Sequence, residues 1–207
     1  MAISAYSELV TAAGNWLSRS DLDARIPEFI ALAEARFRRV LPTIESEVTD
    51  DLTVNAETVA LPADYLQLRA IHLDTDPRKP LDQMTLAALR TFYAAQTVGE
   101  PQAFALTGSS IVFGPAPDAA YTAKITYLAK LTPLTDASPT NWLLADHPDI
   151  YLYAVLLQAE FYGWDDERLP MIKAALDEAI AELTAQSNRK RSSASPQRLR
   201  SSVIEVL

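Results

Sequence analysis

The spacing of the apolar residues changes twice along this chain of 207 residues. Up to residue 42, and again from residue 143, apolar side chains recur at the intervals that place them on one face of a helix. Between residues 43 and 142 they mostly alternate with polar side chains, which is the period of a strand. Because one segment cannot follow both periods, the β-forming part must be an insertion between two helical parts.

We therefore predict an α+β fold. Residues 1–42 and 143–188 form a helical bundle, and 189–207 form an extended C-terminal arm. Residues 43–142 form a β-rich insertion, a small and mainly antiparallel β layer with one helix. The bundle begins with two amphipathic helices, in "YSELVTAAGNWLS" and "IPEFIALAEARFRRVL". In the second, Glu34 and Arg38 lie four residues apart on a face away from the apolar stripe, a spacing typical of an exposed ion pair.

Within the insertion, "TGSS" around Gly108 predicts the turn of a β-hairpin. The turn joins Phe104 and Leu106 on one strand to Ile111 and Phe113 on the next. Further strand-like runs are "LQLRAIHLD" and "TAKITYLAK", and "TLAALRTFYAAQ" predicts the inserted helix.

The segment "HPDIYLYAVLLQAEFYGW" is apolar on several faces of a helix and therefore requires neighbours on several sides. It carries an aromatic series that could serve as a stacking platform for a ligand. Helical spacing favours a packed core or a subunit interface instead, so we regard these residues as candidate interface residues: Tyr151, Tyr153, Phe161, Tyr162 and Trp164.

Charge is distributed unevenly along the chain. The formal net charge is −9, yet the stretch from residue 189 carries five basic residues against Glu205, a formal +4 that leaves −13 for residues 1–188. An acidic body repels phosphate, so the globular part is not expected to grip DNA or an anionic membrane.

The basic stretch has two interpretations. It is either a solvated arm that touches nucleic acid, or a docking arm whose last six residues, "SVIEVL", add as a strand to another chain's sheet. The candidate docking residues are Arg189, Lys190, Arg191, Arg198, Arg200, Val203, Ile204, Val206 and Leu207.

No catalytic signature stands out, and we predict no enzyme, no metal and no cofactor. The chain has two histidines and no cysteine, and its five glycines follow no phosphate-binding spacing. The best metal or hydrolase candidate is the group Asp146, His147 and Asp149, which is more typical of a polar helix start. We also expect no membrane span and no signal peptide, since the sequence has no apolar run of about 18 residues and no cleavable leader pattern.

Three stretches in this order resemble the head-to-tail adaptor proteins of tailed bacteriophages, also called connector or tail tubular A proteins. The most specific parts are "FIALAEAR", "LPADYL" and "NWLLADHPDIYLYA", and the resemblance spans about Tyr6 to Leu183. The resemblance lies in the order of these stretches and in their pattern of residues, and it includes no catalytic motif.

The resemblance implies a structural virion protein, made in the host cytoplasm, that forms a ring of twelve copies between the portal and the tail. Its expected partners are other copies of itself, the portal protein, a downstream tail or nozzle protein, and double-stranded DNA that passes through without sequence-specific binding. The alternative is a DNA-associated head-completion or packaging factor that uses the basic arm. If the five basic residues of the arm each contacted a phosphate, a plot of the logarithm of the DNA-binding constant against the logarithm of the salt concentration would have a slope of about −4 to −5.

Overall fold

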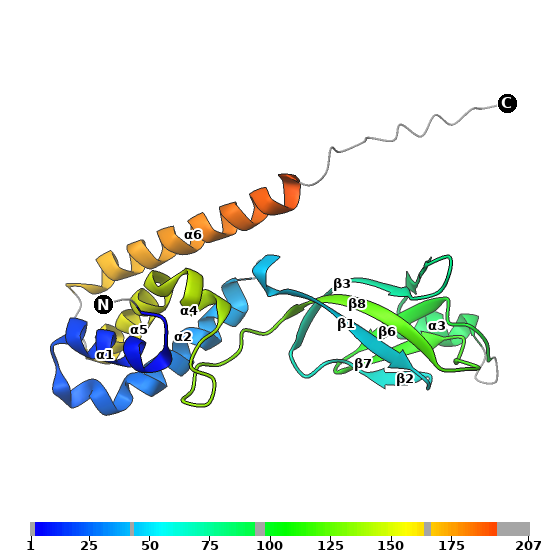
Figure 1. Ribbon diagram of the computed structural model, residues 1–207, viewed down its shortest axis with the longest axis horizontal. Coiled ribbons are helices and arrows are strands. Elements are labelled where there is room, and N and C mark those ends of the chain that lie inside the picture. The colour runs from blue at the N-terminus through cyan, green and yellow to red at the C-terminus, as the bar shows by residue number, and fades with distance from the viewer. Residues whose placement is uncertain (1–2, 42–43, 94–97, 164–166, 194–207) are drawn as a thin grey trace. The chain divides into compact units, whose positions relative to one another are not determined.

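The computed structural model describes residues 3–41, 44–93, 98–163 and 167–193, and the chain divides into two compact units. One unit contains Met1–Glu45 and Thr132–Leu207, and the other contains Ser46–Leu131 (Figure 1). Residues 132–141, expected within the β-rich insertion, belong to the helical unit. Helices and strands are both extensive, so the α+β fold is confirmed.

The helical unit consists of four longer helices and several short ones. In chain order they are α1 (Tyr6–Leu17), the 3₁₀ turn η1 (Ser20–Arg25), α2 (Ile26–Val40), the 3₁₀ turn η2 (Ile44–Ser46) at the border of the two units, α4 (Trp142–Asp146), α5 (Pro148–Gly163) and α6 (Leu169–Ser193). Pro27 lies in the first turn of α2, where its missing N–H costs no helical hydrogen bond.

Helix α5 forms the centre of this unit, packed by α1, α2, α4 and α6. Its sequence is apolar around the whole circumference because it has neighbours on several sides, as expected. The facing helices contribute one apolar stripe each, with Leu9 and Ala13 from α1 and Phe29 and Phe37 from α2 fully buried.

The second unit contains two four-stranded sheets. The first has the order β1 (Glu47–Val54), β8 (Tyr121–Ala129), β3 (Tyr65–Leu73), β4 (Lys79–Pro80), and all neighbours are antiparallel. The second has the order β2 (Thr58–Ala60), β7 (Ser110–Gly114), β6 (Ala103–Thr107), β5 (Asp82–Gln83), with only β5 and β6 parallel. The single β layer of the sequence prediction is thus two layers.

The two sheets pack face to face because alternate residues of each are apolar. Their shared core contains Val54, Ile71 and Leu73 from the first sheet, and Phe104 and Phe113 from the second. Helix α3 (Leu86–Phe92), the inserted helix, covers the other face of the second sheet through its buried Leu89 (Figure 1).

The predicted hairpin is confirmed in its register. Leu106 pairs with Ile111 and Phe104 with Phe113, and the turn begins at Gly108 with φ of 55°. A positive φ at the first turn residue suits a two-residue hairpin and costs glycine no steric strain.

Candidate functional site: aromatic and apolar surfaces of the helical unit

The five aromatic interface candidates separate into different environments. Tyr151 is fully buried in the core of the helical unit, where its ring meets that of Phe37 edge-on at 5.1 Å. It therefore offers no surface to a second copy, because Phe37 and Glu34 of α2 and the side chain of Asn141 already contact it. Tyr153 is half-buried, Phe161 and Tyr162 are exposed, and Trp164 lies outside the described residues.

Tyr151 belongs to a buried polar network that the sequence did not reveal. Its hydroxyl donates to Glu34 Oε1 (3.2 Å), which also accepts from the Leu134 N–H (2.7 Å). Asn141 Nδ2 donates to the Tyr151 hydroxyl (2.7 Å) and to the Thr132 carbonyl (2.8 Å). The network fastens residues 132–141 to α2 and α5.

Glu34 corrects the prediction of an exposed ion-pair face, since only 3% of it is exposed. The physical reason is that Leu134 lies in a segment without regular structure, so its buried N–H needs an acceptor from elsewhere. Burial raises the pKa of Glu34, and the hydrogen bonds from Leu134 and Tyr151 and the charge of Arg38 oppose that rise. Burial likewise raises the pKa of the Tyr151 hydroxyl, and the nearby Glu34 carboxylate adds to the effect.

We predict that Glu34 makes the helical unit less stable as the pH rises. A carboxyl group whose pKa is raised in the folded state binds its proton more tightly there than in the unfolded chain. The protonated Glu34 side chain adds to the free energy of unfolding below pH 4.5, the ordinary pKa of a glutamate. This contribution is lost as the pH rises through the folded-state pKa. The free energy of unfolding of the wild type, relative to Glu34→Gln, should therefore fall above pH 4.5 and then level off.

Urea unfolding followed by tryptophan fluorescence measures this difference in the correct unit, because Trp16, Trp142 and Trp164 all lie in the helical unit. The matched control is Glu182→Gln, which removes an exposed carboxylate from α6. A difference between wild type and Glu34→Gln that stays constant from pH 4.5 to 8 would contradict the raised pKa.

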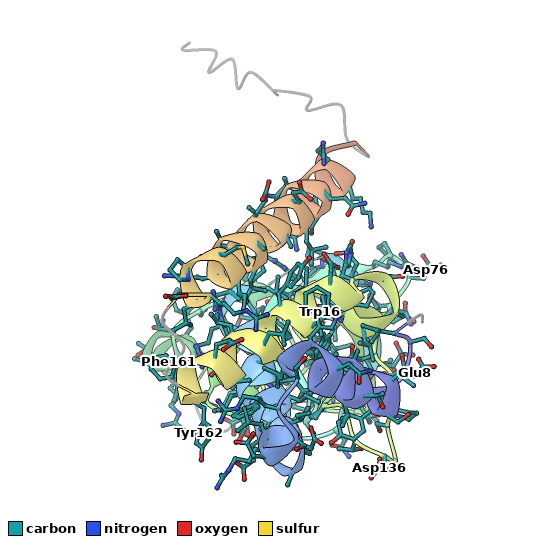
Figure 2. All side chains as sticks on the ribbon, turned by 90° about the vertical axis from the view of Figure 1, so that its left-hand side faces the viewer. Glu8, Trp16, Asp76, Asp136, Phe161 and Tyr162 are labelled. Atoms are coloured by element: carbon teal, nitrogen blue, oxygen red, sulfur yellow. The ribbon has the colours of Figure 1, made fainter. Side chains whose placement is uncertain are left out.

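One apolar hollow lies between α2 and the end of α5. Phe29, Leu32, Gln158, Phe161 and Tyr162 line it, and its volume is about 520 Å³. Phe161 is 73% exposed, and Figure 2 shows it with Tyr162 toward one end of α5. Exposed aromatic side chains of this size are typical of surfaces that contact another protein.

Tyr162 is held in a defined position at this hollow. Its ring lies 5.7 Å from that of Phe29, and the Arg25 guanidinium lies 5.1 Å from the ring centroid. Arg25 also pairs with Glu28 (3.2 Å). The hollow is therefore lined by a side chain that is already oriented, which lowers the entropy cost of covering it.

A second apolar hollow, of about 240 Å³, lies between α1, α5 and α6. Its lining includes Trp16, Tyr153 and Met171, and Trp16 is 53% and Met171 68% exposed. The buried Glu160 carboxylate pairs with Arg168 (3.1 Å), which fixes the start of α6 against the end of α5. The two hollows thus use different faces of the same helix.

The candidate docking residues are divided by the end of α6. Helix α6 continues to Ser193, so Arg189, Lys190 and Arg191 are helical rather than the start of an extended arm. Basic residues in a last turn complement the helix dipole, and Lys190 Nζ also pairs with Glu45 Oε1 (2.6 Å). The other candidates lie outside the described residues: Arg198, Arg200, Val203, Ile204, Val206 and Leu207.

The metal candidates lie at the junction of α4 and α5. Asp146 ends α4, His147 follows it, and Asp149 is in the first turn of α5, where a carboxylate complements the helix dipole. Within the described part of the chain, no three His, Cys, Asp or Glu side chains are grouped so that they could hold a metal ion.

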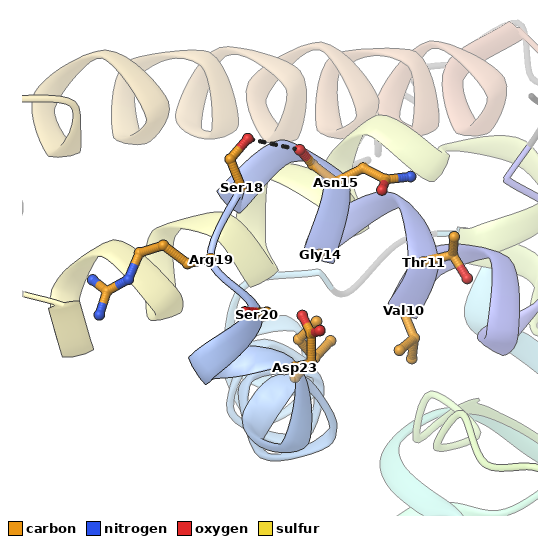
Figure 3. A pocket seen from close by; sticks show the side chains of 9 residues that line it. Val10, Thr11, Gly14, Asn15, Ser18, Arg19, Ser20 and Asp23 are labelled. Atoms are coloured by element: carbon orange, nitrogen blue, oxygen red, sulfur yellow. Dashed lines mark hydrogen bonds between the residues drawn. The ribbon is translucent and has the colours of Figure 1, made fainter.

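A polar hollow of about 610 Å³ lies where α1 turns into η1 (Figure 3). Ser18 adopts φ of 53° there, and its hydroxyl donates to the Asn15 carbonyl (3.2 Å). Gly14 allows the close approach of η1, since a Cβ at this position would lie 3.2 Å from Asp23 Oδ1. These contacts explain the turn and supply no paired nucleophile and base.

Comparison with known proteins identifies the family to which this chain belongs. Residues 4–200 match the family described as SU10 adaptor protein, and the chain belongs to this family of phage head-to-tail adaptors. It is therefore a structural adaptor and a virion component, and membership implies interaction with phage portal and tail proteins. No curated protein matches the chain. Among the described residues, no helix is long and apolar enough to span a bilayer.

Proposed function

We propose that this chain forms a ring of twelve copies between the portal and the tail and surrounds the path of the DNA. It acts through contacts and not through catalysis. The observation that carries the proposal is the match of residues 4–200 to the adaptor family. In this arrangement the helical unit supplies contacts between copies, and the β-rich unit meets the next tail component.

The exposed apolar side chains of the helical unit support the part of the proposal that concerns contacts between copies. Phe161, Trp16 and Met171 each expose more than half of their surface around two hollows on α5. A neighbouring copy that covered them would bury apolar area at about 25 cal/mol per Å². The formal net charge of −13 on residues 1–188 suits a channel wall, because negative charge disfavours adhesion of DNA phosphates.

Counting the copies and identifying their neighbours in the mature particle tests the proposal. Electron microscopy of the neck should show twelve copies adjacent to the portal. The variant Phe161→Asp should lower the yield of rings about tenfold or more, because a buried, unpaired carboxylate costs at least 1.4 kcal/mol or so per contact.

The matched control is Phe92→Asp, which changes an equally exposed phenylalanine (76%) in the β-rich unit. It should leave the yield of rings unchanged. A single copy per particle, or a location away from the portal, would overturn the proposal. An equal loss of ring yield for Phe161→Asp and Phe92→Asp would show that Phe161 has no specific role in the contact between copies.

A further inference from the structure

Strand β1 is a long unpaired sheet edge. It pairs with β8 on one side over eight residues, from Glu47 opposite Leu128 to Val54 opposite Tyr121, and no described strand pairs with its other side. Its first five residues are exposed, including the apolar Val48 (40%). Such an edge presents a row of backbone donors and acceptors to another chain.

The other edges of the two sheets are short. Strand β4 has two residues and contains Pro80, while β5 has two residues and β2 has three. Short edges and proline are the usual means by which a protein prevents edge-to-edge pairing. Strand β4 pairs only with the last two residues of β3, so residues 65–71 of β3 also lack a described strand on that side, but two register shifts interrupt the ladder of this stretch with β8. Among the described strands, β1 is therefore the one long edge whose ladder is regular throughout.

We propose that β1 receives residues 200–207 of a second copy of this chain as an added strand. This inference rests on the proposed function, which brings copies together. The segment "RSSVIEVL" has eight residues, as β1 has, and it is rich in β-branched residues. Residues 194–199 connect it to the end of α6 and can span about 20 Å when extended.

Charge complementarity favours this occupant. Strand β1 carries Glu47, Asp50 and Asp51 and no basic residue. Asp51 pairs with Lys124 (2.7 Å), whereas Glu47 and Asp50 form no ion pair with the residues that the structure describes. The incoming segment begins with Arg200, and Arg198 lies two residues before it. The acidic side chains of β1 would repel a second copy of β1, whereas residues 198–207 carry Arg198 and Arg200 against Glu205, a formal charge of +1.

Disulfide trapping tests the proposal, because the natural chain has no cysteine. One tagged chain carries Asp50→Cys or Asp51→Cys, and a second carries Val203→Cys or Ile204→Cys. When the two eight-residue segments are aligned, residues 203 and 204 lie opposite residues 50 and 51 in either strand direction, and both faces of each strand are sampled. The two chains are assembled together on portal-containing heads and oxidised mildly. At least one combination should give a disulfide between the two chains about tenfold more often than Lys79→Cys, a control on the short edge β4.

Two further measurements separate strand pairing from other contacts. Adding Ile204→Pro to the chain with Val203→Cys should abolish trapping, because proline lacks the N–H that a ladder needs, while Ile204→Thr should preserve it. Each of three results would overturn the inference. The first is trapping no more frequent than with Lys79→Cys, the second is disulfides that form only within one chain, and the third is arm cysteines that react only with the portal. The copy number at the neck is measured independently, so the ring can stand even if this contact fails.

Discussion

Deleting residues 194–207 is expected to lower attachment of the adaptor to portal-containing heads by tenfold or more, about 1.4 kcal/mol. The deletion begins after α6, so the helix and its Lys190–Glu45 pair remain intact. The expected loss follows from the four apolar residues near the end of the sequence, each worth about 1.5–3 kcal/mol on full burial, less the cost of ordering the segment. Quantitative blotting of purified heads measures the attached protein.

Two variants that retain the length of the arm show which of its parts acts. One replaces Arg198 and Arg200 by serine, and the other replaces the apolar group Val203, Ile204, Val206 and Leu207 by serine. We expect the apolar replacement to reduce attachment more, and the arginine replacement to reduce it mainly at low salt. Undiminished attachment of the deleted chain would reject the docking arm.

DNA binding distinguishes the alternative of a head-completion or packaging factor. That function predicts that the isolated protein binds duplex DNA with a log–log salt slope of about −4 to −5, and that the deletion lowers the slope by about two. A docking arm predicts weak binding of the acidic protein to DNA at physiological salt, with and without residues 194–207.

Replacing Tyr151 by alanine is expected to lower the free energy of unfolding of the helical unit by about 3–5 kcal/mol. The side chain is fully buried against Phe37, so the substitution leaves a cavity. It also leaves Glu34 Oε1 without one of its two donors and Asn141 Nδ2 without one of its two acceptors. Tryptophan fluorescence during urea unfolding reports this unit alone.

Phe161→Ala is the matched control, an aromatic residue ten positions further along the same helix and 73% exposed. It should change the free energy of unfolding by no more than about 0.5 kcal/mol. Tyr151→Phe isolates the hydroxyl and should cost about 1–2 kcal/mol. Equal destabilisation by Tyr151→Ala and Phe161→Ala would contradict the division of the aromatic series into core and surface.

The sequence predicts those features that depend on local period and local turn chemistry. The register of the hairpin follows from alternation on both sides of Gly108, and the central position of α5 follows from a helix that is apolar all around. The adaptor class, too, is readable from the order of the motifs, because it requires no distance between residues. The division of the β region into two sheets is less visible, since β2, β4 and β5 are too short to show a period.

What the sequence alone determined is therefore the α+β class, the helical and β-rich segments and the adaptor family. Only the tertiary structure decided that Tyr151 is core while Phe161 is surface, because helical spacing does not say which turns the neighbouring helices cover. It also decided that Glu34 is buried, since the N–H that requires its carboxylate belongs to Leu134, 100 residues further along the chain. Long-range contacts of this kind leave no periodic trace, because each partner is positioned by elements distant from it in the chain.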